Sequence, residues 1–302
     1  MVDLVSDPGQ GRSEIPIGGK GSSSLVVAEQ RYLKLALQGG ALKRSTSPYP
    51  EVELALLRAI APLIPEKTAI DVGAFEGEYT TLMRQLGFSV VAFEPLPELA
   101  LALTTKFKLD DGVKVIASAV GDEDGIATLL LAETNPALAP DADPRLFSSL
   151  VLHRGDGLLA FNSSIATPVR RLRTLIEARH IPAEIGILKV DTEGQDIGVL
   201  VGAWPHLGRI TLCEYWNDTY SLSDHATPNN VNHYNEFLKA KGYFRTITIG
   251  RDLVGQRMVF QVDAVKTVPR SYGNIIITRD ERVFSAALGW CLDVFGPDGL
   301  HI

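Results

Sequence analysis

Short apolar runs alternate with helical patterns through the middle of the chain. The first run, residues 69–72, is short and apolar enough for a buried parallel strand, and residues 80–86 follow with the spacing of a helix that ends at Gly87. The next run brings Glu94 to the end of a second strand. Further strands are expected at 113–117, 185–190 and 210–213, and further helices at 97–109 and 195–203. Residues 168–179 are expected to form a short strand or turn and then a helix. This alternation predicts an α/β fold, with a mostly parallel sheet and helices on both faces.

The two ends of the chain differ from this middle part. Residues 1–24 are rich in Gly and Ser and are expected to be a flexible tail, and residues 25–66 hold two helical patterns, 25–42 and 51–64, which form an N-terminal helical extension. Near the C-terminal end we expect a helix at 229–241 and a closing helix at 281–295. Between them, strand candidates at 243–249, 258–262 and 274–278 are expected to form an antiparallel edge. We therefore expect one main domain over residues 67–302, with core motifs in 67–216 and an edge in 229–302.

Residues 132–164 have little periodicity and several prolines, so we expect a long irregular connection there. Such connections inside compact domains are often functional lids. Within it, Ser148, Ser149 and His153 either face a ligand or are solvated loop residues. A short extra strand is expected just before it, at residues 125–131.

Composition limits the classes of partner and compartment. The 302 residues include 29 Lys and Arg against 36 Asp and Glu, a net charge of −7, so the basic excess that nucleic-acid binding needs is missing. Cys213 and Cys291 are expected to be buried thiols in a reducing compartment. No apolar run is long enough for a membrane span, and we expect a cytoplasmic protein. Trp290 packs either on the sheet or on a second subunit, and the latter would make the protein a homo-oligomer.

Polar groups at the ends of the first two strands indicate a nucleotide site. Gly73 and Gly77 bracket a turn in which a backbone can approach a ligand closely, and Glu94 offers two acceptor oxygens to a ribose diol. Both NAD and S-adenosylmethionine (SAM) carry that diol, and the Gly73-x-x-x-Gly77 spacing lacks a glycine of the dinucleotide pattern. The alternative is that Asp71 and Glu94 only cap strand ends.

Two further strand ends should lie beside this turn. Ser118, Ala119 and Val120 follow the third strand and could flank an adenine ring. After the fourth strand, the period-2 rule places a cation and two carboxylates on one side, namely Lys189, Asp191 and Glu193. An unpaired buried charge is costly, so these groups either serve a ligand or form a structural ion pair.

At this point the motifs resemble a known family. DVGAFEGEYT, VAFEPLPE, SAVGDEDG and ILKVDTEGQD, in this order within residues 67–216, are similar to the FkbM-type SAM-dependent methyltransferases. The resemblance implies the class I methyltransferase (Rossmann-like) fold with seven strands. It also implies methyl transfer from SAM to a hydroxyl, often on a sugar or a polyketide.

The resemblance also implies roles for single residues. Asp71, Gly73 and Gly77 would line the methionine end of SAM, Glu94 would hold the ribose, and Ser118, Ala119 and Asp122 would border the adenine. Lys189, Asp191, Glu193 and Gly194 would face the methyl group and the acceptor. The same motifs contribute further residues to the expected donor site, which are Ala74, Tyr79, Thr80, Pro95 and Val120.

The chain departs from the family pattern at two positions, Phe75 and Arg173, and Asp196 is a conservative change. Phe75 stands where Asn is usual, which leaves the geometry of the glycine turn open. Arg173 stands where the family often has Asp, so the charge on the acceptor side can differ. Asp196 replaces a usual Glu.

These observations predict a SAM-dependent O-methyltransferase that acts on a small-molecule or glycan hydroxyl. Asp191 is the first candidate for the base and Glu193 the second, with Lys189 beside them. An NAD-dependent oxidoreductase and a non-catalytic SAM-fold scaffold are the alternatives.

The acceptor side and metal use remain open in the sequence. Residues after the fifth strand and two histidines could shape an acceptor pocket, although a core role fits Trp216 equally: Tyr215, Trp216, Asn217, His225 and His233. No metal site is expected. Glu214 together with Asp191 gives a metal-assisted alternative, because hard cations bind carboxylate oxygens.

Overall fold

A computed structural model describes residues 52–134, 143–151, 159–217, 229–242, 244–252, 257–263, 268, 270–296 and 300. The expected tail 1–24, the expected helix 25–42, His153 and His225 lie outside these ranges.

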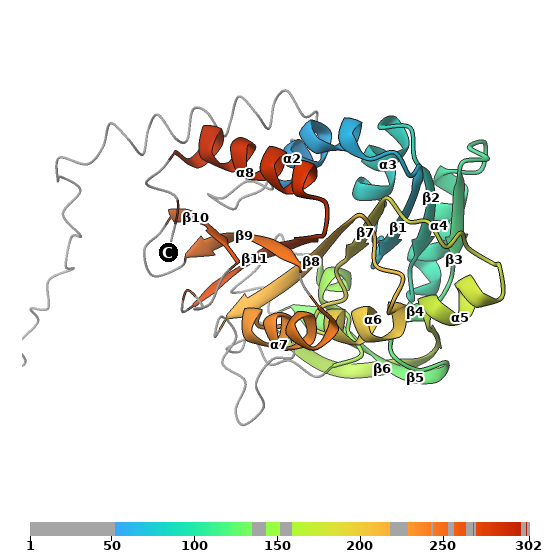
Figure 1. Cartoon of the computed structure of the whole chain (residues 1–302). Coiled ribbons are helices and arrows are strands. Elements are labelled where there is room, and N and C mark those ends of the chain that lie inside the picture. The colour runs from blue at the N-terminus through green and yellow to red at the C-terminus, as the bar shows by residue number, and fades with distance from the viewer. Residues whose placement is uncertain are drawn as a thin grey trace, which may run out of the picture.

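The main sheet has eight strands in the order β10-β9-β11-β8-β7-β1-β2-β3 (Figure 1). The pairs from β3 to β8 are parallel, and the pairs that join β8 to β11, β9 and β10 are antiparallel. The strands are β1 (Thr68–Val72), β2 (Ser89–Phe93), β3 (Val113–Ile116), β7 (Ile187–Val190), β8 (Ile210–Asn217), β9 (Arg245–Asp252), β10 (Arg257–Val262) and β11 (Ser271–Thr278). The predicted mostly parallel sheet with an antiparallel C-terminal edge is confirmed. It has eight strands where the family resemblance implies seven, and all eight, including β10, lie at strand candidates of the sequence.

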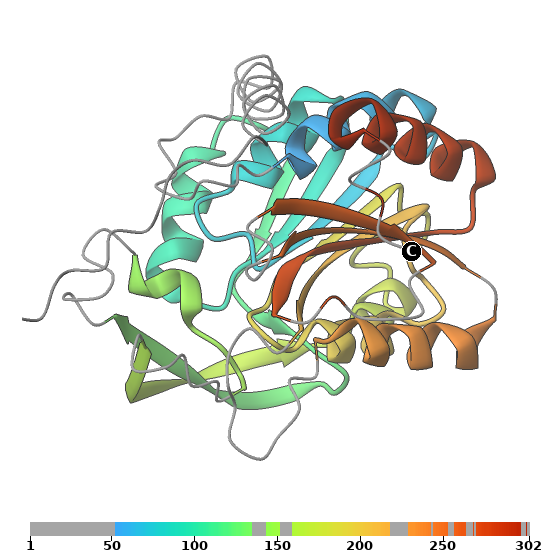
Figure 2. The same cartoon turned by 90° about the vertical axis from the view of Figure 1, so that its left-hand side faces the viewer.

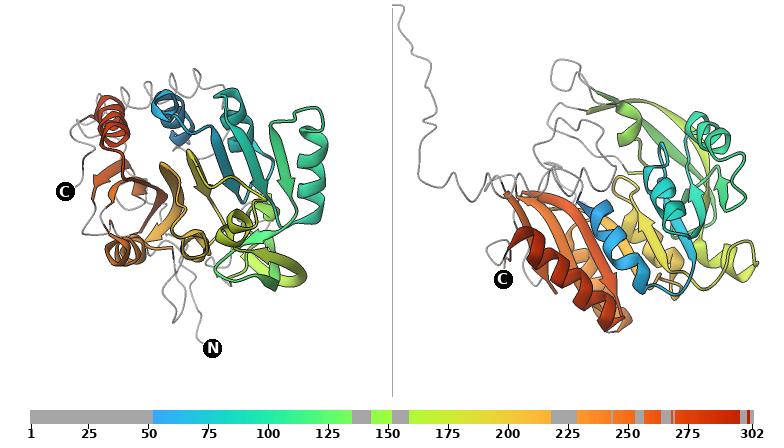
Figure 3. Two further views of the ribbon diagram at one scale, coloured as in Figure 1. Left: turned by 45° about the vertical axis from the view of Figure 1, so that its right-hand side comes forward. Right: turned by 90° about the horizontal axis from the view of Figure 1, so that it is seen from above.

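Helices cover both faces of this sheet, as predicted (Figures 1 and 3). One apolar cluster joins α2 (Glu53–Ile60), α3 (Glu78–Gln85) and α8 (Glu281–Phe295) to one face of the sheet. Helix α4 (Pro97–Lys106) covers the same face. A short 3-10 helix, η1 (Ala61–Leu63), follows α2. A second cluster joins α5 (Leu172–Glu177), α6 (Asp196–Ala203) and α7 (Val231–Lys241) to the other face. In the view from above, α2 and α8 lie side by side (Figure 3). None of the described helices is both long and apolar enough to cross a membrane.

Local sequence signals set where several of these helices begin. Pro97 occupies the first turn of α4, where its missing N–H removes no hydrogen bond. The side chain of Asn230 accepts a hydrogen bond from the His233 N–H at the start of α7, and Asp280 caps α8 through the N–H groups of Arg282 and Val283. These caps satisfy donors that have no partner within the helix.

The expectation of an irregular connection over 132–164 was wrong at both of its ends. β5 (Gly125–Thr134) and β6 (Leu159–Arg170) pair over most of their length, and β4 (Ala119–Val120) joins them in a second sheet of order β4-β6-β5. The turn η2 (Pro144–Phe147) packs beside β5. Most of β6 was missed because residues 159–164 were taken into the irregular connection, and only a short strand or turn was expected from Pro168 onward. Pro168 fits a strand because β4 pairs only with residues 169 and 170, which leaves Pro168 at an edge.

Candidate active site

A pocket opens at the carboxyl ends of the parallel strands, which is where open α/β sheets bind ligands. Gly73, Glu94 and Asp191, which follow β1, β2 and β7, all line it. The expected grouping of these three residues at one rim is therefore observed. Other predicted residues that line the same pocket are Pro95, Ser118, Ala119, Val120, Ser148, Ser149 and Glu193.

The glycine turn after β1 is packed directly against the loop after β7. Gly73 has a φ of +74°, and a Cβ atom built on it would lie 1.8 Å from the carbonyl oxygen of Asp191. Only glycine fits this close approach. Gly77, with a φ of +76°, instead faces the side chain of Leu103 on α4 and does not line the pocket.

Glu94 is buried, with its carboxylate oriented by two backbone groups. Its Oε2 accepts a hydrogen bond from the Phe75 N–H at 2.8 Å, and its Oε1 accepts one from the Leu96 N–H at 3.0 Å. Each oxygen therefore keeps acceptor capacity for a second donor. Burial raises the pKa of Glu94 above its ordinary value, against the lowering effect of these two hydrogen bonds.

Ser118 supplies a second polar group that fits a ligand. The residue is 2% exposed and its Oγ has no hydrogen-bond partner among the described residues, although it lines the same pocket as Glu94. Buried hydroxyl groups are normally paired, so an orphaned one in a pocket suits a ligand. Glu94 and Ser118 thus match a ribose diol and a heterocyclic base respectively.

A charged layer lies beneath the turn. Asp71 is fully buried and accepts a hydrogen bond of 2.6 Å from the Thr80 hydroxyl. The Lys189 Nζ lies 3.7 Å from Asp71 Oδ1 and 3.4 Å from Asp191 Oδ2, and it donates to the Gly73 carbonyl at 3.1 Å. It also lies 5.0 Å from the centre of the Tyr79 ring. Asp71, Tyr79 and Thr80 therefore support the turn from below and do not line the pocket.

The protonation of this layer follows from burial and charge. Burial by itself lowers the pKa of Lys189, but the charges of Asp191 and Asp71 outweigh it, and the pKa lies above its ordinary value. Burial raises the pKa of Asp71, although Lys189 and the Thr80 hydroxyl oppose this rise. Lys189 is therefore a fixed cation that orients its neighbours, and it does not act as a base.

Three carboxylates meet beside the loop after β7, and two of them, Asp191 and Glu193, line the pocket, whereas Glu214 does not. Asp191, Glu193 and Glu214 each place an oxygen within 4.8 Å of the other two. Burial, followed by the charges of neighbouring carboxylates, raises the pKa values of Glu193 and Glu214 well above their ordinary range. Such a group holds either a shared proton or a hard cation. No metal site was expected from the sequence, yet the oxygens of these three carboxylates lie close enough together to bind one cation. Glu193 was not among the ligands of the metal-assisted alternative.

Asp196 ties two of these strand ends together, and sequence reasoning gave it no role. Its Oδ1 accepts hydrogen bonds from the N–H and the hydroxyl of Thr192, and its Oδ2 accepts one from the Glu214 N–H at 2.9 Å. Burial, together with the charge of Asp191, raises the pKa of Asp196 to about 6. The available signal was its position at the first residue of a helix that follows a charged strand end.

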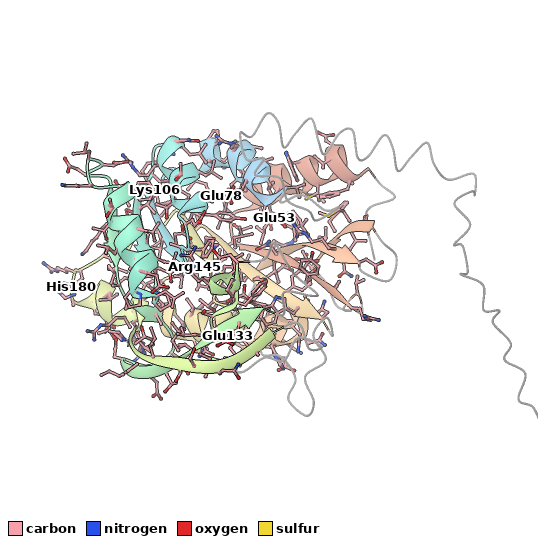
Figure 4. All side chains as sticks on the ribbon, turned by 180° about the vertical axis from the view of Figure 1, so that it is seen from behind. Glu53, Glu78, Lys106, Glu133, Arg145 and His180 are labelled. Atoms are coloured by element: carbon pink, nitrogen blue, oxygen red, sulfur yellow. The ribbon has the colours of Figure 1, made fainter. Side chains whose placement is uncertain are left out.

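Residues 143–151 form a roof over the pocket, and we call them the roof segment. Five of them line the pocket, namely Arg145, Leu146, Ser148, Ser149 and Leu150. The segment lies between α4 and the β5–β6 ribbon, and Arg145 lies between this ribbon and the parallel strands (Figures 2 and 4). Of this segment, the sequence had indicated only Ser148 and Ser149.

Several predicted site residues lie elsewhere. Asp122 is exposed and Ala74 is buried, and neither lines the pocket. Asn217 is buried, where it accepts from the Val231 N–H and donates to the Ser271 hydroxyl, a structural role. Three other candidates are absent from the pocket: Tyr215 and Trp216, which are each 2% exposed, and His233, which is half-buried on α7.

Comparisons with solved structures return proteins of low identity. They include a precorrin-6y C5,15-methyltransferase from Geobacter metallireducens, with 11% identity, coverage of 78% of this chain and 91% of that chain, and a TM-score of 0.38. An rRNA methylase from Streptococcus thermophilus gives 6% identity, coverage of 77% of this chain and 98% of that chain, and a TM-score of 0.37. A precorrin 8w decarboxylase from Methanobacterium thermoautotrophicum gives 16% identity, coverage of 79% of this chain and 96% of that chain, and a TM-score of 0.37. Similarity at this level does not define a substrate.

A search of curated proteins found no match to the sequence. The family comparison is more specific, because the methyltransferase FkbM domain matches residues 71–244. This match spans more than half of the 302-residue chain and includes every strand end that lines the pocket. The chain therefore belongs to the FkbM methyltransferase family and is a SAM-dependent methyltransferase.

Proposed function

We propose that the protein is an O-methyltransferase that transfers a methyl group from SAM to a hydroxyl of a carbohydrate or a secondary metabolite. The observation that supports this most directly is that Glu94 and Asp191 line one pocket on either side of Gly73. A ribose-binding carboxylate and a second carboxylate suited to a hydroxyl then lie on one continuous surface. The charge balance of −7 argues against a nucleic-acid acceptor.

The residues of the pocket fit SAM. The Glu94 carboxylate has free acceptor capacity for the two ribose hydroxyls, since its bonds from Phe75 and Leu96 use one lone pair on each oxygen. Ser118 offers its unpaired hydroxyl to the adenine edge. Gly73, backed by the Asp191 carbonyl, lets the donor approach the turn without a side chain in the way.

SAM supplies an electrophilic methyl group on a positively charged sulfur, and the protein must align the acceptor oxygen with it. In this proposal Asp191 holds the acceptor hydroxyl and takes its proton. Its side chain is 37% exposed, whereas Lys189 behind it is 6% exposed, so the carboxylate is both accessible and fixed in orientation. Alignment of this kind contributes several kcal/mol, and a positioned base adds about 10²–10⁴-fold.

Glu193 and Glu214 take a supporting part in the proposed mechanism. Their raised pKa values favour the protonated form of at least one of them. In its protonated form Glu193, which lines the pocket, donates a hydrogen bond to a second acceptor hydroxyl, which suits a polyhydroxylated substrate. Asp191 therefore remains the first candidate for the base, with Glu193 second.

The test combines donor binding with a screen for the acceptor. Titration with S-adenosylhomocysteine (SAH) should give saturable binding, and incubation with labelled methyl donor and pools of glycans and metabolites should label one hydroxyl class. Asp191→Asn should leave SAH binding within about 3-fold and lower methyl transfer by about 10²-fold or more. The same measurements on Glu193→Gln compare the two candidates for the base.

Each alternative gives a different result. Binding of NAD without binding of SAM or SAH would indicate an oxidoreductase and overturn the proposal. Binding of SAH without turnover of any acceptor would favour a non-catalytic scaffold. Activity that Asp191→Asn leaves unchanged would remove Asp191 from the mechanism.

A further inference from the structure

Phe75 occupies a backbone conformation that a phenylalanine rarely adopts. Its φ is +49°, in the left-handed region. A bulky side chain there costs free energy, whereas Asn and Gly adopt this region more readily. Strained residues of this kind persist where the surroundings hold them in place, and they concentrate at functional sites.

The backbone of Phe75 serves the donor site directly. Its N–H donates to Glu94 Oε2 at 2.8 Å, while the N–H groups of Gly73 and Ala74 both donate to the Phe93 carbonyl. The turn is thereby tied to the end of β2. This backbone contact does not depend on the phenyl ring, because a residue with a smaller side chain would retain the same N–H.

The ring itself packs where the turn meets the roof segment. Phe75 packs against a buried cluster of Leu96, Leu99 and Leu129, and Leu150 of the roof segment packs against the same cluster. Both Phe75 and Leu150 also line the pocket. The apolar cluster therefore connects the glycine turn, β5 and the roof segment beside Glu94.

The roof segment has polar attachments as well. The Ser149 hydroxyl donates to the Glu193 carbonyl at 2.6 Å, and Ser149 forms an antiparallel bridge with Leu130 of β5. Arg145 is held by a two-pronged pair with Asp143, and its guanidinium lies 5.9 Å from the centre of the Phe75 ring. The segment is thus fastened to the loop after β7 by Ser149 and to the loop after β1 through the cluster that Phe75 joins.

We propose that Phe75 is a positioning residue whose ring keeps the roof segment over the bound donor. The gain in donor binding from this packing offsets the free-energy cost of the left-handed backbone at residue 75. The proposal rests on the proposed donor site and adds to it. The ring acts through the roof segment, so its removal should raise the rate at which the donor leaves. Its removal should also relieve the strain of the left-handed backbone.

The variant Phe75→Asn separates these two effects. Asn keeps the N–H that binds Glu94, tolerates the left-handed backbone and lacks the ring. We expect the dissociation constant for SAH, measured by calorimetry, to rise about 10-fold, mainly through faster dissociation. Lost packing and relieved strain oppose each other, so the melting temperature should stay within about 3 °C of the wild type. Phe75→Tyr, which retains a ring, should bind SAH like the wild type.

Arg179 offers a matched control, because it also has a left-handed backbone, with a φ of +58°, but is exposed and does not line the pocket. Arg179→Asn should leave SAH binding unchanged. A double variant with Leu150→Ala tests the route of the effect. If Phe75 acts through the roof segment, Phe75→Asn and Leu150→Ala should weaken binding less than additively when combined.

The outcomes distinguish this proposal from the proposed function. If the wild type binds SAH but Phe75→Asn binds it equally well, Phe75 has no positioning role. Additive effects of Phe75→Asn and Leu150→Ala would show that the two side chains act independently and would overturn the action of the ring through the roof segment. If the wild type itself fails to bind SAH, the donor site is wrong and Phe75 loses its proposed role with it.

Discussion

At the residue scale, the proposed site depends on a few atoms that admit little variation. Gly73 cannot carry a side chain because the Asp191 carbonyl occupies the space, and Glu94 is 4% exposed with both oxygens oriented by backbone N–H groups. Lys189 holds the Gly73 carbonyl and Asp191 in one cluster. The proposed donor and acceptor sites therefore share a rigid boundary.

Glu94→Ala should weaken donor binding without abolishing the fold. If Glu94 accepts both ribose hydroxyls, their loss corresponds to about 1–3 kcal/mol, or roughly a 5- to 150-fold higher dissociation constant for SAH. Calorimetry measures the constant, and thermal unfolding identifies any general loss of structure. Unchanged affinity in a folded Glu94→Ala protein would remove Glu94 from the donor site.

Gly73→Ala should damage the site more than an equivalent change elsewhere. The new Cβ would collide with the Asp191 carbonyl, so the loop after β7 must shift, and a displacement of about 1 Å can cost 10²-fold in activity. Gly87→Ala is the matched control, because Gly87 has a φ of +85° and none of the described atoms lies within 4 Å of the place that a Cβ would take there. Both variants share the backbone strain, but only Gly73→Ala should lose SAH binding by about 10-fold or more. Equal SAH affinities in the two variants would contradict the close approach.

At the element scale, the start of α6 connects the loops that carry the carboxylates. Asp196, the first residue of α6, binds Thr192 after β7 and the Glu214 N–H on β8. The Asp196 N–H in turn donates to the Asn229 side chain before α7. The spacing of Asp191, Glu193 and Glu214 is therefore set by the placement of one helix terminus.

Asp196 should make stability depend on pH in a defined direction. Its pKa is raised from an ordinary value of 3.8 to about 6, so the folded state binds this proton more tightly than the unfolded state. The stabilisation is fully present below about pH 4 and is lost as pH rises through about 6. Urea unfolding should thus show that this contribution to the free energy of unfolding decreases as the pH rises from about 4 to 7. Asp196→Asn should remove this decrease. An identical pH slope in both proteins would show that another group is responsible.

At the scale of the whole molecule, a buried ion pair joins helix α2 to the antiparallel edge of the sheet. Glu53 on α2 accepts hydrogen bonds from Arg251 of β9 at 2.9 and 3.2 Å and from the Asn274 side chain of β11 at 3.1 Å. The side chains of Glu53 and Arg251 are 0% and 5% exposed. Figure 4 shows Glu53 on α2 beside the antiparallel edge. This pair holds a helix that precedes β1 to strands that close the sheet about 200 residues later.

Glu53→Gln should destabilise the protein strongly. Arg251 would keep its charge in a buried position with a neutral amide in place of the Glu53 carboxylate, and the loss of one charge of a buried pair costs about 3–5 kcal/mol in comparable cases. Denaturant unfolding measures the loss. Glu177→Gln is the control, since its pair with Arg173 is exposed and its removal should leave stability essentially unchanged. Equal stabilities of the two variants would show that the buried pair has no structural role.

Much of the fold could be predicted because its signals are local. The closing helix was expected at 281–295, where α8 lies, and the strands β1, β2 and β7 fall within the expected runs to one or two residues. Buried parallel strands are short apolar runs, and they can be recognised without long-range information. Most of β6 was missed because residues 159–164 show little periodicity, and only the pairing with β5 reveals them as a strand.

The sequence by itself determined the order of strands and helices outside the β5–β6 region, the glycine turn, the acidic end of β2 and the family. Each of these is written in consecutive residues with a fixed period or spacing. Only the tertiary structure decided which side chains face the pocket. In the folded protein Glu214 lies beside Glu193, and Asp122 is exposed outside the pocket. Phe75 packs in one cluster with the roof segment, and Asp196 binds two loops. These relations join segments far apart in the chain, and they depend on strand register and on helix packing, which no local pattern encodes.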